Sequence, residues 1–277
     1  MPLLTYARGM SFAALSLMFL MGCAVASKNT QPVPEVRPGF LAGYLPKEGL
    51  PDSLALVPPP PAAGSEAFAA DQQVHRSTRG LRDTPRWAFA TKDAALSFPA
   101  AASVFSCAVG AAISEETTPR LYVLLRRTLM DGALATYAAK DHYQRRRPFV
   151  EFSERSCTPQ DEPRLAQDGS YPSGHSALGW TWALVLTELA PERMNPILQR
   201  GYAFGQSRVI CGVHWQTDVD AGRMIASAVM AKLHANQEFM ASMRAASEEV
   251  RRAPAAHATQ CAAEAAVLAS KVPGVAP

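Results

Sequence analysis

Apolar residues recur at helical spacing along this chain from Gly64 onward, and signals for β-strands are nearly absent. The clearest helix start is Thr117-Thr118-Pro119, where a capping threonine is followed by a proline in the first turn. The residues that follow mark one inward face at helical spacing. We expect this helix to carry Lys140 near its end and to stop before Pro148. The residues of that face are Leu121, Leu124, Leu125, Thr128, Leu129, Gly132, Thr136 and Ala139. The pattern predicts an all-α, single-domain helical bundle.

Four further helices are predicted at residues 176–189, 195–207, 213–237 and 239–270, the last one broken near Pro254. In the third of these we expect an inward face made of Val219, Met224, Ala228 and Leu233. Residues 94–113 are weakly polar but are built from alanine rather than leucine and contain Pro99. We therefore expect a buried helix there rather than a membrane span.

The N-terminal residues 1–26 resemble a signal peptide, with Arg8 followed by a short apolar run and the cleavage pattern Ala24-Val25-Ala26. An alternative is a bacterial lipobox ending at Cys23, which would leave a lipid-modified cysteine as an anchor. We favour a soluble periplasmic protein. Residues 27–63 are proline-rich and predict an extended arm rather than a helix, and residues 64–277 form the remaining domain.

The net charge of the chain narrows the classes of partner. The formal net charge of +3 is too small to indicate binding to nucleic acid or to an anionic membrane surface.

The cysteines indicate disulfide bonds. Cleavage after Ala26 leaves the cysteines Cys107, Cys157, Cys211 and Cys261. In an exported protein four cysteines indicate two disulfides, and three pairings are open. Their spacing does not fit a zinc site.

Three segments concentrate polar chemistry in this helical chain. They are KDHYQRRRPF at 140–149, DGSYPSGHSALGW at 168–180 and SRVICGVHWQTD at 207–218. Each alone has an ordinary explanation: a solvated arginine run after a helix, a Ser-Gly helix cap, or a surface pair of His214 and Asp218. Together they make chemical sense as a site for a phosphate ester.

A phosphate group needs cations and hydrogen-bond donors around its oxygens. Lys140, Arg147 and Arg208 supply three cations, and guanidinium groups suit the geometry of phosphate. The Ser173 hydroxyl and the amides of 173–175 at a helix start add donors, and Gly174 permits close approach of the backbone.

Two histidines can then divide the chemistry. One must be neutral to attack phosphorus, and the other must be protonated to release the alcohol. We assign His214 as the nucleophile, oriented by Asp218, and His175 as the general acid. This division fits a mildly acidic to neutral working pH. With no carboxylate cluster left to hold a metal, we expect metal-independent chemistry without a cofactor.

The arrangement K-x6-RP, PSGH and SR-x5-H-x3-D resembles the three-part signature of the type 2 phosphatidic acid phosphatase (PAP2) superfamily, which includes the vanadium haloperoxidases. Residues 169–175 and 214–223 are similar to the bacterial class A non-specific acid phosphatases in particular. The proline-rich arm is similar to theirs as well, so the resemblance covers most of the chain after residue 26. One departure is Ser176, where that class usually has threonine, and we expect it to be neutral.

The resemblance implies a helical bundle of the PAP2/haloperoxidase type and the same site residues, His214, His175 and Asp218 with the phosphate ligands Lys140, Arg147, Ser173, Gly174 and Arg208. It implies the disulfide Cys157–Cys211, which leaves Cys107–Cys261, and association into a homo-oligomer. The implied function is a periplasmic acid phosphatase of broad specificity that acts through a phosphohistidine on small phosphate monoesters such as nucleotides, sugar phosphates or aryl phosphates, with phosphotransfer to alcohols as a further activity.

Three alternatives remain beside this interpretation. A vanadate-dependent haloperoxidase would use the same ligands, but the 169–175 loop and the arm argue against it. A lipid phosphatase would be expected to have several strongly apolar membrane helices, which the sequence lacks. A phosphate-binding module would need the cations but would have no use for His214, Asp218 and His175 in acid–base roles.

Overall fold

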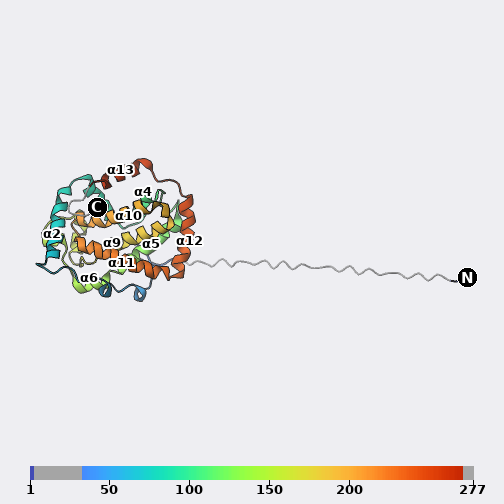
Figure 1. The fold of residues 1–277 in the computed structure, drawn as a ribbon, viewed down its shortest axis with the longest axis horizontal. Coiled ribbons are helices and arrows are strands. Elements are labelled where there is room, and N and C mark those ends of the chain that lie inside the picture. Colours follow the sequence, from blue (N-terminus) through green and yellow to red (C-terminus); the bar gives the residue numbers. More distant parts are fainter. Residues whose placement is uncertain (3–32, 271–277) are drawn as a thin grey trace. The chain divides into compact units, whose positions relative to one another are not determined.

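A computed structural model describes residues 1–2 and 33–270 of the chain (Figure 1). Residues 3–32 lie outside the described residues. They include the predicted signal peptide after residue 2, Cys23, and residues 27–32 of the predicted arm. The division into an arm and a helical domain stays a prediction, and the description below concerns Val33–Ser270.

The described chain is helical apart from one small sheet. Strands β1 (Glu35–Arg37) and β2 (Phe40–Leu41) pair antiparallel, with Glu35 opposite Leu41. The α-helices are α1 (Ser53–Leu56), α2 (Glu66–Thr78), α3 (Pro85–Asp93), α4 (Ser106–Val109), α5 (Pro119–Leu134), α6 (Tyr137–Tyr143), α7 (Pro148–Glu151), α8 (Glu162–Leu165), α9 (Gly174–Leu189), α10 (Met194–Ile210), α11 (Gln216–His234), α12 (Gln237–Arg252) and α13 (Ala258–Leu268). Short 3-10 turns are η1 (Lys47–Gly49), η2 (Arg79–Leu81), η3 (Ala100–Phe105), η4 (Pro159–Asp161) and η5 (Pro191–Arg193). The predicted all-α class is confirmed.

Helix α9 forms the centre of the core and packs against α5, α10 and α11 (Figure 1). It is apolar around most of its circumference, and Leu178, Trp182 and Leu186 are fully buried. The approach of α5 is close because Gly132 has no side chain, and a Cβ there would lie 2.8 Å from the Leu178 Cα. This packing brings the N-terminus of α9 beside the C-terminal half of α5 and the start of α11.

Most helix predictions are confirmed, and the face from Leu121 to Ala139 is buried as expected. The predicted helix from 119 onward is, however, divided into α5 and α6. The break follows Leu134, where the Thr136 hydroxyl donates to the Ala133 carbonyl. On α11 the prediction for Met224 was wrong, since this side chain is half exposed, and Ala228 is only partly buried. The inward face of α11 instead follows Val219, Gly222, Ile225, Ala226, Val229 and Leu233.

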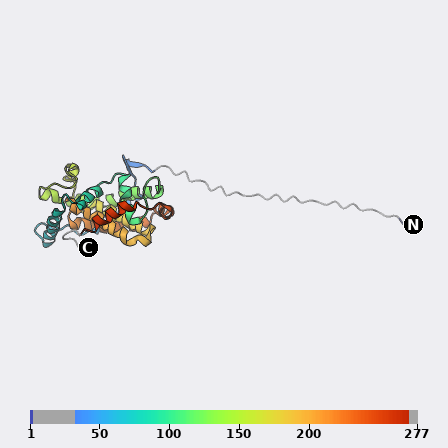
Figure 2. The same cartoon turned by 90° about the horizontal axis from the view of Figure 1, so that it is seen from above.

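Residues 94–113 do not form the expected buried helix. They form η3 and the short helix α4, which ends at Gly110 in the left-handed conformation. In the described part of the chain no helix is both long and apolar enough to cross a membrane. Helix α13, whose ribbon crosses the body in Figure 2, is tied to α4 by the disulfide Cys107–Cys261. The disulfide Cys157–Cys211 is also present, so both expected pairings are confirmed.

The described part of the proline-rich segment lies on the helices and contains the four-residue helix α1, where the sequence predicted only extended chain. Asp52 caps α1 by accepting from the Leu54 amide, which is a local signal that the proline content obscured. The buried Asp131 carboxylate on α5 accepts the amides of Tyr44 and Leu45. Further along, Tyr171 donates its hydroxyl to the Pro58 carbonyl at 2.7 Å.

Candidate active site

The first polar segment places two cations in the interior. Lys140 lies in the last turn of α6, is 3% exposed and donates from Nζ to the Gly169 carbonyl at 2.7 Å. Burial, with Arg147 as the next cause, lowers the pKa of Lys140 to about 8. Arg147 precedes α7 as its N-cap residue, where Pro148 at the first turn starts the helix. The segment therefore turns both side chains toward the loop that precedes α9.

The second segment caps α9. The Ser173 hydroxyl accepts from the Ser176 amide at 3.3 Å, while the Ser173 amide donates to the backbone carbonyl of Asp218 at 2.9 Å. The prediction that the Ser173 amide contacts phosphate was therefore wrong in this structure, because α11 uses it. The amides of Gly174 and His175 belong to the first turn of α9 and have no acceptor within the helix. A Cβ on Gly222 of α11 would lie 2.5 Å from the Ser173 carbonyl oxygen, so only a glycine permits this contact between the helices.

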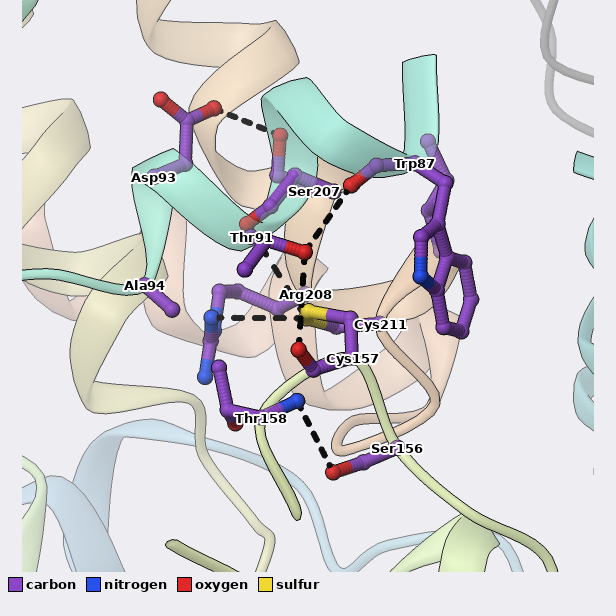
Figure 3. The surroundings of a disulfide bond; sticks show 12 residues. Trp87, Thr91, Asp93, Ala94, Ser156, Cys157, Thr158, Ser207, Arg208 and Cys211 are labelled. Atoms are coloured by element: carbon purple, nitrogen blue, oxygen red, sulfur yellow. Dashed lines mark hydrogen bonds between the residues drawn. A yellow bond between two sulfur atoms is a disulfide. The ribbon is translucent and has the colours of Figure 1, made fainter. Parts of the chain in front are cut away.

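Arg208 lies in the last turn of α10, buried against the Cys157–Cys211 disulfide (Figure 3). Its Nη1 lies 3.9 Å from the Cys211 sulfur, and its buried Nε has no hydrogen-bond partner within residues 33–270. Among the ion pairs of the described residues none involves Arg208. Burial lowers its pKa to about 10, so the guanidinium stays charged. A buried cation without an anionic partner is costly unless an anion from outside completes it.

His214 and Asp218 form the expected pair at the start of α11. The His214 Nδ1 lies 3.3 Å from Asp218 Oδ2, which also accepts the Trp215 amide at 2.8 Å. On the other side of the ring, His214 Nε2 lies 3.1 Å from Arg147 Nη1. A guanidinium only donates, so this contact requires a lone pair on Nε2 and a proton on Nδ1. Burial and the charge of Arg147 hold the pKa of His214 well below its usual range, which keeps the ring neutral.

His175, one residue after Gly174, is oriented by α3. Its Nε2 lies 3.1 Å from the Ala94 carbonyl, which can only accept, so Nε2 carries a proton. This leaves Nδ1 as the nitrogen free to exchange a proton. Burial, followed by the charge of Arg208, places the pKa of His175 well below its usual range. The ring is therefore neutral while no anion is bound.

Of the three cations around these two rings, two have no carboxylate partner in the described part of the chain. Lys140, Arg147 and Arg208 are all buried, and Arg147 alone of the three pairs with a carboxylate, that of Asp168 at 3.2 Å. The eight predicted site residues thus come together around two neutral imidazoles in a positively charged interior, which suits a phosphate group. None of them lines the cavity of about 570 Å³ between α3, η3, α10 and α13. Among residues 33–270 there is no group of three histidine, cysteine, aspartate or glutamate side chains that could hold a metal ion.

Sequence reasoning missed two residues of this site, Arg145 and Asp71. The arginine run at 145–147, taken alone, is typical of a solvated helix end, yet the Arg145 side chain is 7% exposed and donates to Asp218 and to Asp71. The missed signal is on α2, where Asp71, His75 and Thr78 are polar at helical spacing and all three are buried. A polar stripe on the inward face of a helix indicates partners in the interior.

Comparisons with known proteins show the family of this chain. The family described as PAP2 superfamily matches residues 120–240, which carry all three polar segments. A non-specific acid phosphatase of Providencia stuartii is 48% identical over 207 residues, 74% of this chain and 84% of that protein. One of Salmonella typhimurium is 43% identical over 208 residues, covering 75% and 83% of the two chains, and an acid phosphatase of Zymomonas mobilis is 41% identical over 202 residues, covering 73% and 76%. The chain therefore belongs to the PAP2 superfamily, as an acid phosphatase of the type named non-specific in these bacterial relatives.

Proposed function

We propose that the protein is a broad-specificity acid phosphatase that hydrolyses small phosphate monoesters through a phosphohistidine on His214. The observation that carries this proposal is the placement of the His214 ring, whose Nδ1 lies 3.3 Å from Asp218 Oδ2 and whose Nε2 lies 3.1 Å from the guanidinium of Arg147 inside the cationic interior. A bound phosphate would replace His214 as the partner of that guanidinium and would lie beside the nucleophilic nitrogen. Arg208 and Lys140 then hold the remaining oxygens, with the Ser173 hydroxyl and the amide of Gly174 as further donors.

The reaction follows in two displacements. The His214 Nε2 lone pair forms a bond to phosphorus as the ester P–O bond breaks, and the leaving oxygen takes a proton from His175. The positive charge that develops on His214 is stabilised by Asp218 across the Nδ1–H bond. His175 then takes a proton from water, the water oxygen attacks phosphorus, and the P–N bond breaks to release inorganic phosphate. An alcohol in place of water gives phosphotransfer by the same step.

Metal-independent hydrolysis is part of this proposal, because the cations that offset the phosphate charge all belong to the chain. The test is release of phosphate from nitrophenyl phosphate and nucleotides near pH 6 in the presence of a chelator. We expect full activity with chelator, inhibition by vanadate, and loss of activity in His214→Ala. The matched control is His142→Ala, an exposed histidine of the same segment as Lys140. Activity that persists in His214→Ala, or that depends on added metal, contradicts the mechanism.

The covalent intermediate can be observed directly. Rapid quenching at alkaline pH should trap a protein carrying one phosphoryl group on His214, and intact-mass analysis would detect it in the wild type and in Asp218→Asn at a lower level. Absence of phosphoprotein under conditions where product forms in a burst would overturn the phosphohistidine.

We further propose export to the periplasm with cleavage after Ala26, and self-association of the mature chain. The alternative is lipid attachment at Cys23. Fractionation of expressing cells separates the two: release by osmotic shock supports the soluble form, and activity retained with membranes supports the anchor. Size-exclusion chromatography with light scattering gives the number of subunits, and a monomer would contradict the expected homo-oligomer.

A further inference from the structure

A chain of buried ion pairs connects α2 with the pair of His214 and Asp218. Arg145 donates from Nη1 to Asp218 Oδ1 at 2.6 Å and from Nη2 to Asp71 Oδ2 at 2.7 Å. Asp71 in turn accepts the Thr217 amide at 3.0 Å and the Thr217 hydroxyl at 2.5 Å. Both carboxylates are at most 2% exposed, so water does not screen these charges.

The geometry divides the Asp218 carboxylate between two tasks. Arg145 holds Oδ1, while Oδ2 accepts from the His214 ring and from the Trp215 amide. An aspartate held at both oxygens cannot rotate, so its hydrogen bond fixes the His214 ring in the orientation that exposes the Nε2 lone pair.

The network also sets the charge beside His214. Arg145 alone would neutralise Asp218 and weaken its attraction for a protonated or phosphorylated ring. Asp71 counters the charge of Arg145, so the trio retains one net negative charge next to His214. Asp71 belongs to α2, a helix that contributes none of the eight predicted site residues.

We propose that Arg145 and Asp71 are positioning residues that tune the protonation of the His214 nucleophile through Asp218. This inference rests on the proposed role of His214 in phosphate ester hydrolysis. It assigns opposite electrostatic effects to the two residues: Arg145 disfavours a positive His214, and Asp71 favours it.

The other titratable groups facing His214 come from several surrounding elements. They are the cations Lys140 of α6, Arg147 before α7 and Arg208 of α10, the carboxylate of Asp218 on α11 and the neutral ring of His175 on α9. Burial, followed by the charges of the three cations, already holds the pKa of His214 well below its usual range. Since this environment is buried, the gain or loss of one further charge at Arg145 or Asp71 should move the protonation of His214 measurably.

The test compares Arg145→Gln, Asp71→Asn and Arg145→Lys in the full chain, using the acidic limb of the kcat/KM profile. Arg145→Gln should move that limb to higher pH by about one unit, and Asp71→Asn should move it to lower pH. Arg145→Lys keeps the charge but cannot bridge both carboxylates, so the limb should stay in place while kcat falls about tenfold. The matched controls are Arg146→Gln and Glu66→Gln, exposed neighbours on the same two segments, which should leave the profile unchanged.

Nuclear magnetic resonance titration of ring-labelled histidine provides a readout that does not depend on activity. The His214 resonances, assigned with His214→Ala, should titrate at higher pH in Arg145→Gln and at lower pH in Asp71→Asn. Shifts of the same sign in both variants, or unchanged His214 titration in folded protein, would overturn the proposal and leave the network a purely structural one. Should Arg145→Gln fail to fold, Asp71→Asn and Arg145→Lys still give the two decisive comparisons. A wild type without phosphatase activity would instead refute the proposed function, and the titration would still report on the network.

Discussion

The guanidinium of Arg147 lies 3.1 Å from Nε2 of His214, so each of the two side chains holds the other inside the buried interior. The same side chain donates from Nε to the Leu165 and Asp168 carbonyls, each at 2.9 Å, and from Nη1 to the Val213 carbonyl. Its position is therefore fixed by the backbone of two segments. In the proposed mechanism, Arg147 orients the Nε2 lone pair in the free enzyme and binds phosphate in the complex with substrate.

The first prediction concerns Arg147→Lys. A lysine has a point charge and lacks the planar fork, so it cannot keep the carbonyl contacts and also bind phosphate. We expect a loss of kcat/KM for nitrophenyl phosphate on the order of 100-fold, as for loss of one donor to a transition state. Arg146→Lys is the matched control, because the Arg146 side chain is exposed and only its backbone carbonyl contacts the site, through Trp215. Equal activities of the two variants would contradict a role of Arg147 in phosphate binding.

The second prediction concerns the source of the proton for the leaving group. The pKa of His175 lies well below its usual range, so near pH 6 Nδ1 of this ring carries no proton in the free enzyme that could pass to the leaving group. The proton must then arrive with the substrate, as the monoanion of the phosphate ester, whose second pKa is near 6. We expect the basic limb of kcat/KM to follow the second pKa of the substrate when esters that differ in this value are compared. A basic limb at one fixed pH for all esters would show that the enzyme supplies the proton before binding.

Local signals in the sequence predicted the parts of the site that depend on local structure. Ser173 and Gly174 begin α9 as expected, because a capping serine and a glycine act within one turn. His214 and Asp218 lie four residues apart, so the start of one helix is enough to bring them together. The chemistry of phosphate binding then grouped Lys140, Arg147 and Arg208, although no spacing in the sequence showed that these three are close.

Features that depend on distant partners were not predictable in the same way. Arg145 looks like its exposed neighbour Arg146, and its partner Asp71 is 74 residues away in the sequence. The break between α5 and α6 has no proline to mark it, and the turn at Thr136 follows from hydrogen bonding within the chain. Met224 was assigned to the core from apolar character alone, whereas the close approach of α11 to α9 depends on Gly222, where a Cβ would lie 2.5 Å from the Ser173 carbonyl oxygen.

The third prediction concerns stability and pH. His75 is 1% exposed and stacks on Phe152 at 4.8 Å, and burial lowers its pKa to about 3. The unfolded chain binds the proton near pH 6.5, so the stability associated with neutral His75 is complete above that pH and is lost as pH falls toward 3. Between pH 7 and pH 5 this amounts to about 2 kcal/mol. His75→Phe should keep the ring packing and reduce the loss of unfolding free energy over this range by that amount.

Denaturant unfolding at pH 5, 6 and 7 measures this effect. His142→Phe serves as the control, since His142 is an exposed residue and the substitution should leave the pH dependence of the wild type intact. The interpretation fails if His75→Phe loses as much stability on acidification as the wild type does.

The fourth prediction separates the two disulfides, which span 154 residues for Cys107–Cys261 and 54 residues for Cys157–Cys211. In the chain-entropy account these loops confer about 5 and about 4 kcal/mol of stability, so removal of either bond should lower the melting temperature by a similar amount. Their positions differ, because Cys211 follows Arg208 by three residues and precedes His214 by three. The Cys157 amide also donates to the Cys211 carbonyl, which joins the loop before η4 to the end of α10.

Removal of the bond near Arg208 should therefore affect phosphate binding, whereas removal of the distant bond should not. We expect the variant with Cys157→Ala and Cys211→Ala to show a KM for nitrophenyl phosphate raised about tenfold and weaker inhibition by vanadate, because Arg208 loses its fixed support. The variant with Cys107→Ala and Cys261→Ala should keep the wild-type KM at temperatures where it remains folded. Circular dichroism melting curves and steady-state kinetics on the same samples test both statements. Equal changes of KM in the two variants would mean that the Cys157–Cys211 bond contributes to stability alone, and that Arg208 is held in place by the helix that carries it.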